Sequence, residues 1–202
     1  MRAELPYFLI GTAYGGWQEW FSDYMMREGG CAAVTACDCS IYFELFKGIR
    51  GLYPYDVQSI SRNDYIKFAD IMKPYLRPRW TGIDRLDIYI DGFQKFLHDR
   101  NVTNINLYPW AGDANLESTK FIIKSQIERG FPIPFLILNH SNPAIHAYYY
   151  WHWFILNGCD DSDNFKVKAV SYGSWRWIDL ADLWNTGFER KGGLIIFKNN
   201  SK

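Results

Sequence analysis

The sequence lacks an excess of charge of either sign. Its 202 residues include 22 basic and 22 acidic side chains, and no block of like charge stands out. Proteins that bind nucleic acids or anionic lipid surfaces need clusters of Lys and Arg. The charge balance argues against both classes, and we expect neither a nucleic acid nor a membrane as a partner.

Long apolar runs are also missing. The stretch from Phe131 to Leu138 is interrupted by prolines and falls far short of the ~20 residues that span a bilayer. Near the N-terminus, Glu4 and Pro6 stand where an export signal needs its apolar core. These absences predict a soluble protein located in the cytoplasm.

Cysteine is scarce, and the pattern of the four residues does not favour a metal site. Cys31, Cys37 and Cys39 lie close together in the sequence, and Cys159 follows far downstream. In a reducing compartment such thiols are expected to stay free. Cys37 and Cys39 are two positions apart on a predicted helix, so their side chains face different directions. We therefore expect no bound metal, and nothing in the sequence calls for a cofactor.

Hydrophobic periodicity divides the chain into helical and extended parts. Apolar residues at helical spacing predict helices over residues 31–47, 63–73, 84–98 and 116–129, with a one-turn helix over 179–184. Apolar runs bounded by turn residues predict strands over 105–110, 131–139, 151–158, 165–172, 174–178 and 194–198. Helices dominate the first two thirds and antiparallel strands the last third, so the single domain expected over residues 1–202 has an α+β fold. Asn63 and Asp84 are the expected N-caps of the second and third helices.

Two glycines, Gly29 and Gly30, precede Cys31 at the predicted start of the central helix. Unpaired N–H groups and the helix dipole favour a thiolate there, so we expect the pKa of Cys31 to lie below its usual value of about 8.5. The same N–H groups can receive the negative charge of an oxyanion. Alternatively, Cys31 is a small apolar residue packed under a turn, since free cysteine is among the most buried residue types.

A thiolate nucleophile needs a base, and four histidines are candidates. His98 ends an amphipathic helix, whereas His140 and His146 fall in a predicted loop, and all three are expected to be exposed. His152 begins a predicted strand, and a sheet can hold and aim an imidazole. It follows Cys31 by roughly 120 positions, close to the ~130–150 that separate the two residues in papain. A structural role for His152 is the alternative.

Three segments resemble a known family. Gly30 to Ala36 is similar to the nucleophile helix of the bacteriocin-processing cysteine peptidases, which remove double-glycine leaders, and His152 to Asp160 resembles their histidine strand. Asp179 to Trp184 resembles the short helix that follows in that family. The resemblance implies a papain-like fold and a cysteine peptidase, or a related thiol hydrolase or acyltransferase, acting on a peptide or small acyl substrate.

The sequence departs from the family at the residue that orients the histidine. Ser171 stands where the family has Asp or Asn. A hydroxyl can accept a hydrogen bond from imidazole but does not stabilise imidazolium as a charge does. This departure implies a Cys-His dyad, a substitute acid such as Asp160 or Asp179, or a site that has lost activity.

The oxyanion side chain implied by the resemblance is a glutamine a few residues before the cysteine. Met25 and Met26 occupy that interval here, and Gln18, further upstream, is the nearby candidate. With the amide of Cys31 it would complete a two-donor site for an oxyanion. Gln18 is alternatively a polar surface residue beside two tryptophans.

Two other classes of function compete with catalysis. One is a catalytically inactive, peptide-binding module on a papain-like scaffold, because a fold does not guarantee an activity. The other is a carbohydrate- or small-molecule-binding protein, since aromatic residues make up 18% of the chain. The tyrosine-rich segment 140–150 is expected to fold over the cleft and restrict access to it.

Overall fold

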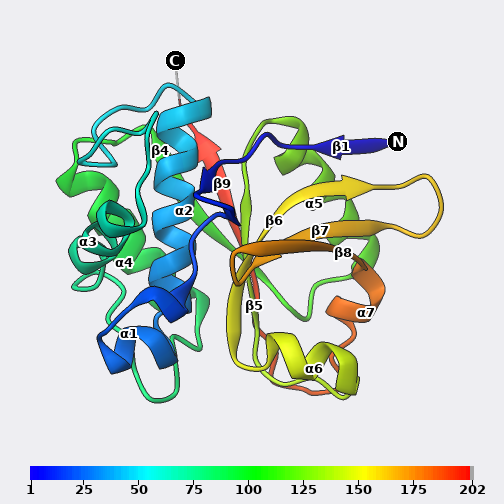
Figure 1. Cartoon of the computed structure of the whole chain (residues 1–202). Helices are drawn as coiled ribbons and strands as arrows, with labels where there is room; N and C mark the ends of the chain where they lie inside the picture. The colour runs from blue at the N-terminus through cyan, green and yellow to red at the C-terminus, as the bar shows by residue number, and fades with distance from the viewer. Residues whose placement is uncertain (201–202) are drawn as a thin grey trace.

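The computed structural model describes residues 1–200 and combines helices with a large antiparallel sheet (Figure 1). The helical elements are η1 (Gln18–Trp20), α1 (Tyr24–Gly29), α2 (Cys31–Phe46), α3 (Arg62–Met72), α4 (Leu86–Asp99), α5 (Leu116–Glu128), α6 (Pro143–Tyr149) and α7 (Leu180–Trp184). The strands are β1 (Arg2–Glu4), β2 (Leu9–Ile10), β3 (Ala13–Tyr14), β4 (Ile105–Ala111), β5 (Ile133–Ile137), β6 (His152–Asp160), β7 (Lys166–Ser171), β8 (Ser174–Asp179) and β9 (Gly193–Asn199). The predicted α+β class is confirmed.

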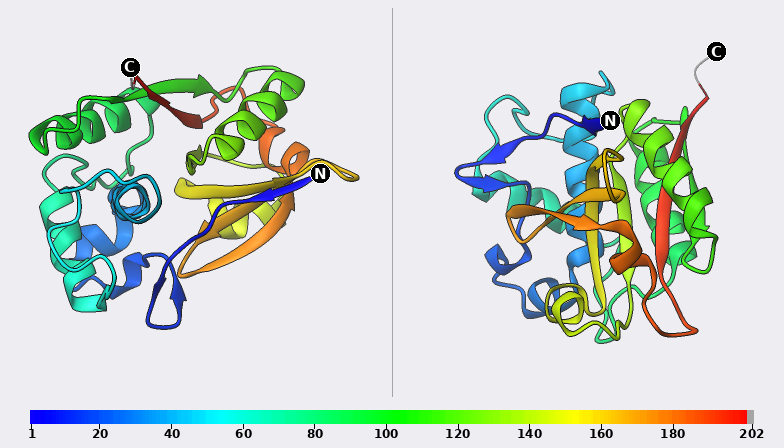
Figure 2. Two further views of the ribbon diagram at one scale, coloured as in Figure 1. Left: turned by 90° about the horizontal axis from the view of Figure 1, so that it is seen from above. Right: turned by 90° about the vertical axis from the view of Figure 1, so that its right-hand side faces the viewer.

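The large sheet runs in the order β4-β9-β5-β6-β7-β8, with every neighbouring pair antiparallel. β1 pairs with the last three residues of β6, beyond the stretch of β6 that β5 covers. β6 is therefore central, and all of it except Asp160 is buried. In Figure 1, α1 to α4 stand to the left of β5 and β6, and α5 to α7 stand to the right. Figure 2 shows the same arrangement from above and from the side.

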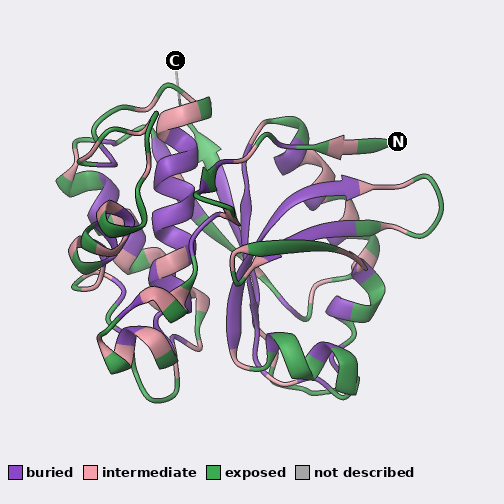
Figure 3. Ribbon diagram, in the orientation of Figure 1, coloured by how far each residue is buried: buried purple, intermediate pink, exposed green. Residues whose placement is uncertain are grey.

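α2 is the central helix and packs against β6. Of its residues from Cys31 to Phe43, only Val34 is not buried, and Figure 3 colours this part of the helix almost wholly as buried. A helix that is apolar on all sides is stable only when it is enclosed. Cys37 lies in this core.

Two helix starts differ from the prediction. Ser61, not Asn63, caps α3: its hydroxyl accepts the N–H of Asp64 at 3.1 Å and donates to the Asp64 carboxylate at 2.8 Å. α4 begins at Leu86 without a side-chain cap, and Asp84 instead forms an ion pair with Arg190. The prediction for Asp84 is wrong because an acid can serve equally in an ion pair or in a cap, and the sequence does not distinguish the two.

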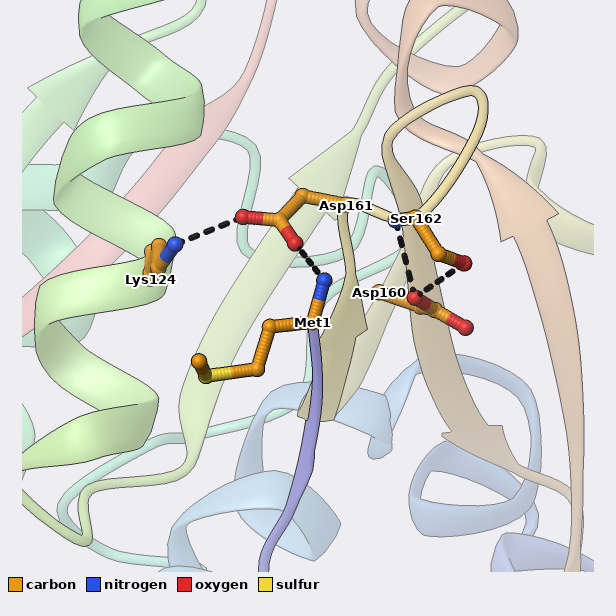
Figure 4. A network of polar contacts seen from close by, with 5 residues as sticks. All are labelled: Met1, Lys124, Asp160, Asp161 and Ser162. Atoms are coloured by element: carbon orange, nitrogen blue, oxygen red, sulfur yellow. Dashed lines mark hydrogen bonds and ion pairs between the residues drawn. The ribbon is translucent and has the colours of Figure 1, made fainter.

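The turn between β6 and β7 joins three parts of the chain (Figure 4). Asp160 accepts hydrogen bonds from the backbone N–H of Ser162 at 3.0 Å and from its hydroxyl at 2.7 Å. Asp161 pairs with the amino group of Met1 and, at 2.6 Å, with Lys124 of α5. These groups are exposed to solvent, which screens their charges, so the pairs contribute little to stability.

None of the helices within residues 1–200 is long and apolar enough to cross a bilayer. The same part of the chain contains no group of three or more His, Cys, Asp or Glu side chains placed to hold a metal ion.

Candidate functional site

Cys31 is the first residue of α2, and a direct helix-to-helix junction places it there. Gly30 is both the C-cap of α1 and the N-cap of α2, and its N–H donates to the carbonyl of Met26 at 3.0 Å. A Cβ atom on Gly30 would lie 2.2 Å from that carbonyl oxygen, and one on Gly29 would lie 2.6 Å from the carbonyl oxygen of Arg79. Only glycine fits at both positions. The Gly29-Gly30 pair therefore allows α2 to begin directly after α1, with Cys31 as its first residue.

His152 is the first residue of β6 and is enclosed by its neighbours. Its Nε2 atom lies 2.7 Å from Oγ of Ser171, at the end of β7. The ring of Tyr172 stacks on the imidazole with centroids 4.6 Å apart and planes 8° apart. Trp151 and Tyr172, which flank the site, have positive φ values of 49° and 53°. Such values are uncommon for bulky residues and concentrate at functional sites.

The four side chains singled out in the sequence line one small cavity. Cys31 comes from α2, Gln18 from η1, His152 from β6 and Ser171 from β7. The cavity measures about 20 Å³, enough for one water molecule. Asp38 of α2 also lines it.

Some of the expected contacts are absent in this conformation. Among the described residues, no hydrogen bond joins Sγ of Cys31 to the imidazole of His152, and the backbone N–H of Trp153 acts on the thiol only by lowering its pKa. The side-chain Nε2 of Gln18 donates to the carbonyl of Arg27 at 2.8 Å. An amide nitrogen carries two hydrogens, so one of them remains available.

Neither acid considered as a substitute for Ser171 lies near His152. Asp160 is at the opposite end of β6, and eight residues of extended strand span about 26 Å. Lys166 pairs with both Asp160 and Asp179 across the sheet, which places Asp179 at that same far end. Among residues 1–200, Ser171 is the side chain hydrogen-bonded to the imidazole.

The prediction of a lowered pKa for Cys31 is wrong. Burial of the thiol, which is 4% exposed, raises its pKa, and this effect exceeds the opposite effect of the backbone N–H groups of Trp153, Ala32 and Cys31. Burial also lowers the pKa of His152 to about 3. Both groups are therefore neutral near pH 7, a thiol beside an uncharged imidazole.

A second, larger pocket brings solvent to the other side of Cys31. It measures about 370 Å³, within the range of ligand pockets, and Cys31 is the one residue that it shares with the small cavity. Its walls come from the end of α1, the connection before α4 and the residues that precede β6. The lining residues are Glu28, Gly29, Cys31, Trp80, Thr81, Gly82, Tyr150 and Trp151.

The segment 140–150 contributes part of these surroundings. It forms α6, which the sequence did not predict, and Tyr150 directly after it lines the larger pocket. The hydroxyl of Tyr172 donates to the carbonyl of Tyr148 at 3.1 Å, so α6 is tied to the residue that covers His152.

The other histidines lie elsewhere. His140, predicted to be exposed, is buried; its Nε2 lies 2.7 Å from the carbonyl oxygen of Asp182 and its Nδ1 accepts the N–H of Asn142. His98 and His146 are exposed, as predicted.

The chain thus combines a mixed helical and antiparallel-sheet fold with a cluster of buried Cys31 and His152 and half-buried Ser171 next to a surface pocket. No protein-family model, no curated protein and no solved structure matches it.

Proposed function

We propose that this protein is a papain-like thiol hydrolase or acyltransferase that acts on a peptide or small acyl substrate, with Cys31 as nucleophile and His152 as base. The observation that carries the proposal is the convergence of Cys31, His152, Gln18 and Ser171, from four separate elements, on one cavity. Nucleophile, base and a group that orients the base are the three parts that covalent acyl transfer requires.

The reaction begins from the neutral pair. A substrate carbonyl enters from the larger pocket and reaches Cys31, while Nδ1 of His152 takes the thiol proton as sulfur attacks the carbonyl carbon. Collapse of the tetrahedral intermediate breaks the bond to the leaving group, to which His152 returns the proton, and leaves a thioester on Cys31. Water or another acceptor then attacks the thioester, and the thiol is restored.

Ser171 selects the tautomer of His152 that this role needs. When Nε2–H donates to Oγ of Ser171, the lone pair on Nδ1 remains free for the thiol proton. A hydroxyl adds no charge to stabilise the imidazolium. Replacing the orienting acid of a catalytic triad by a neutral residue lowers kcat by about 10⁴, so we expect slow turnover.

The oxyanion is held by two donors. One is the backbone N–H of Cys31, which has no partner within α2 because it belongs to the first turn. The other is the second amide hydrogen of Gln18. A single donor of this kind is worth about 3 kcal/mol of barrier.

Labelling with iodoacetamide tests the nucleophile. Cys37, Cys39 and Cys159 are buried without contributing to either pocket, whereas Cys31 lines both. We expect Cys31 to be labelled first in the native protein, at a rate that increases up to and beyond pH 9 because burial raises its pKa. Equal, slow labelling of all four cysteines would contradict the proposal.

The inactive peptide-binding module is the second candidate, and one observation favours it. None of the acidic side chains within residues 1–200 lies against His152, and burial opposes the charged form of both Cys31 and His152. Such a module binds a peptide at the larger pocket without forming a thioester. Intact-mass spectrometry after incubation with a peptide thioester separates the two, because only an enzyme gains the mass of the acyl group.

A further inference from the structure

Asp38 is a buried carboxyl group in the wall of the small cavity. It follows Cys31 by two turns of α2, and residues seven positions apart lie on the same face of a helix. Its exposed fraction is 3%, and it lines the cavity together with Cys31 and Gln18. The catalytic steps described above make no use of it.

The hydrogen bonds of Asp38 all join α2 to other parts of the chain. Tyr65 of α3 donates to Oδ1 at 2.7 Å, and Tyr7 donates to Oδ2 at 3.0 Å. The backbone N–H of Gly16 lies 3.1 Å from both oxygens. Within residues 1–200, no Lys, Arg or His pairs with this carboxyl group. A buried acid without a cation is costly, so its retention needs a specific reason.

The turn that Asp38 binds has no room for other residues. A Cβ atom on Gly16 would lie 1.9 Å from the hydroxyl oxygen of Tyr65, and one on Gly15, whose φ is +77°, would lie 2.5 Å from Oδ2 of Asp38. The Gly15-Gly16 backbone is therefore wrapped closely around the carboxyl group and the phenol. Gln18 begins η1 only two residues after Gly16.

We propose that Asp38 is a positioning residue, which fixes the Gly15-Gly16 turn through the Gly16 N–H and thereby holds the amide of Gln18 beside Cys31. This inference rests on the proposed function, because it assigns Gln18 to the oxyanion. Asp38 itself touches neither the substrate nor the reacting atoms. It acts through one backbone hydrogen bond and the short chain that follows it.

A double-mutant cycle on the acylation of Cys31 by a peptide thioester tests this proposal. We expect Gln18→Ala to lower the acylation rate constant about 100-fold at an unchanged half-saturating concentration, as loss of one oxyanion donor does. Asp38→Asn, which keeps the volume but replaces one acceptor oxygen with an amide, should lower it about 10-fold. The double variant should react no more slowly than Gln18→Ala, because Asp38 then has no donor left to position.

Glu44→Gln is the matched control. Glu44 is also an α2 carboxylate that binds backbone N–H groups of a neighbouring loop, those of Leu52 and Tyr53 at 3.0 and 2.8 Å, but it does not line the cavity. We expect it to acylate at the wild-type rate. Losses that multiply in the double variant, or an Asp38→Asn protein as fast as Glu44→Gln, would overturn the proposal.

The side-chain amide NMR signals of Gln18 give a second readout that does not depend on catalysis. They should shift in Asp38→Asn and, to a smaller extent, in Tyr65→Phe, which removes the shortest hydrogen bond to Asp38 and serves if Asp38→Asn does not fold. Signals that stay at their wild-type positions in a folded variant would overturn the positioning role. If the signals shift but the wild-type protein forms no acyl adduct, the positioning role stands and the proposed function fails.

Discussion

The ring of Tyr172 lies parallel to the imidazole of His152, with centroids 4.6 Å apart. This stacking shields the imidazole from water, and the hydrogen bond from Tyr172 to the carbonyl of Tyr148 holds the ring in place. The Tyr172 ring therefore helps to keep the proposed base uncharged, since burial is the cause of the lowered pKa of His152.

Removing the Tyr172 ring should raise the pKa of His152. We expect Tyr172→Ala to move it from about 3 towards the ordinary value of about 6.5, because water then reaches the ring. Titration of the histidine C–H signals by NMR measures the change, with the exposed His98 as an internal reference. Tyr172→Phe keeps the stacking and should leave the pKa low; an unchanged pKa in Tyr172→Ala would contradict this account of the shift.

The same shift predicts how stability depends on pH. The pKa of His152 is lower in the native state than in the unfolded chain. Between about pH 6.5 and pH 3 the unfolded chain therefore binds a proton at this residue that the native state does not. The contribution of neutral His152 to the free energy of unfolding is fully present above pH 6.5 and is lost as the pH falls through this range. By pH 5 the loss is about 2 kcal/mol. Urea unfolding at pH 8 and pH 5 should show this loss in the wild type but not in His152→Gln. Equal losses of unfolding free energy in both proteins would show that the pH dependence of stability comes from other groups than His152.

Ser171→Asp offers a gain of activity. A carboxylate next to Nε2 stabilises the imidazolium that forms when His152 takes the thiol proton, so we expect acylation to be at least 10-fold faster and the pKa of His152 to rise. Ser171→Ala, which removes the partner of the imidazole, should be slower than the wild type. An inactive binding module would show no acylation in any of the three proteins.

The aromatic wall of the larger pocket should affect substrate binding rather than chemistry. Trp80 is 80% exposed at this pocket, where its ring is free to contact a bound substrate. We expect Trp80→Ala to raise KM about 10-fold, equivalent to 1.4 kcal/mol, with little change in kcat. Phe121→Ala is the control, since Phe121 is similarly exposed but lies on α5 away from the pocket. Equal KM values for the two variants would contradict the expectation that the substrate binds in this pocket.

Much of the fold was predictable because its strongest signals are local. Strands β6 to β9 and helices α2 to α5 follow the hydrophobic period of the sequence. The short α1 and α6 were missed. For α6 a signal was present, since Asn142 caps the helix and Pro143 occupies its first turn. For α1 the signal was the N-cap Asp23, whose carboxylate accepts the N–H of Met26 at 3.0 Å, but the helix is short and has only Met26 and Gly29 buried.

The candidate site was predictable in its members but not in its electrostatics. The order of Cys31 and His152 along the chain indicated the pair. Asp38 could also have been predicted to lie near the site, because it follows Cys31 by seven residues on the predicted helix. The direction of the Cys31 pKa shift could not be predicted from the sequence. The helix start is a local feature of the sequence, whereas the burial of the thiol comes from β6 and its neighbours, which are distant along the chain. At Cys31 the desolvation of the thiol raises the pKa by more than the backbone N–H groups lower it.

The most direct test of the central claim is the mass of the protein after brief exposure to a peptide thioester. We predict that the wild type gains one acyl group, that peptide mapping places it on Cys31, and that His152→Ala forms this adduct at least 100-fold more slowly. Cys31→Ser should gain no acyl group over the same period. Acyl transfer to Cys31 at the same rate with and without the imidazole, or no transfer at all, would contradict the claim that Cys31 and His152 form a catalytic pair.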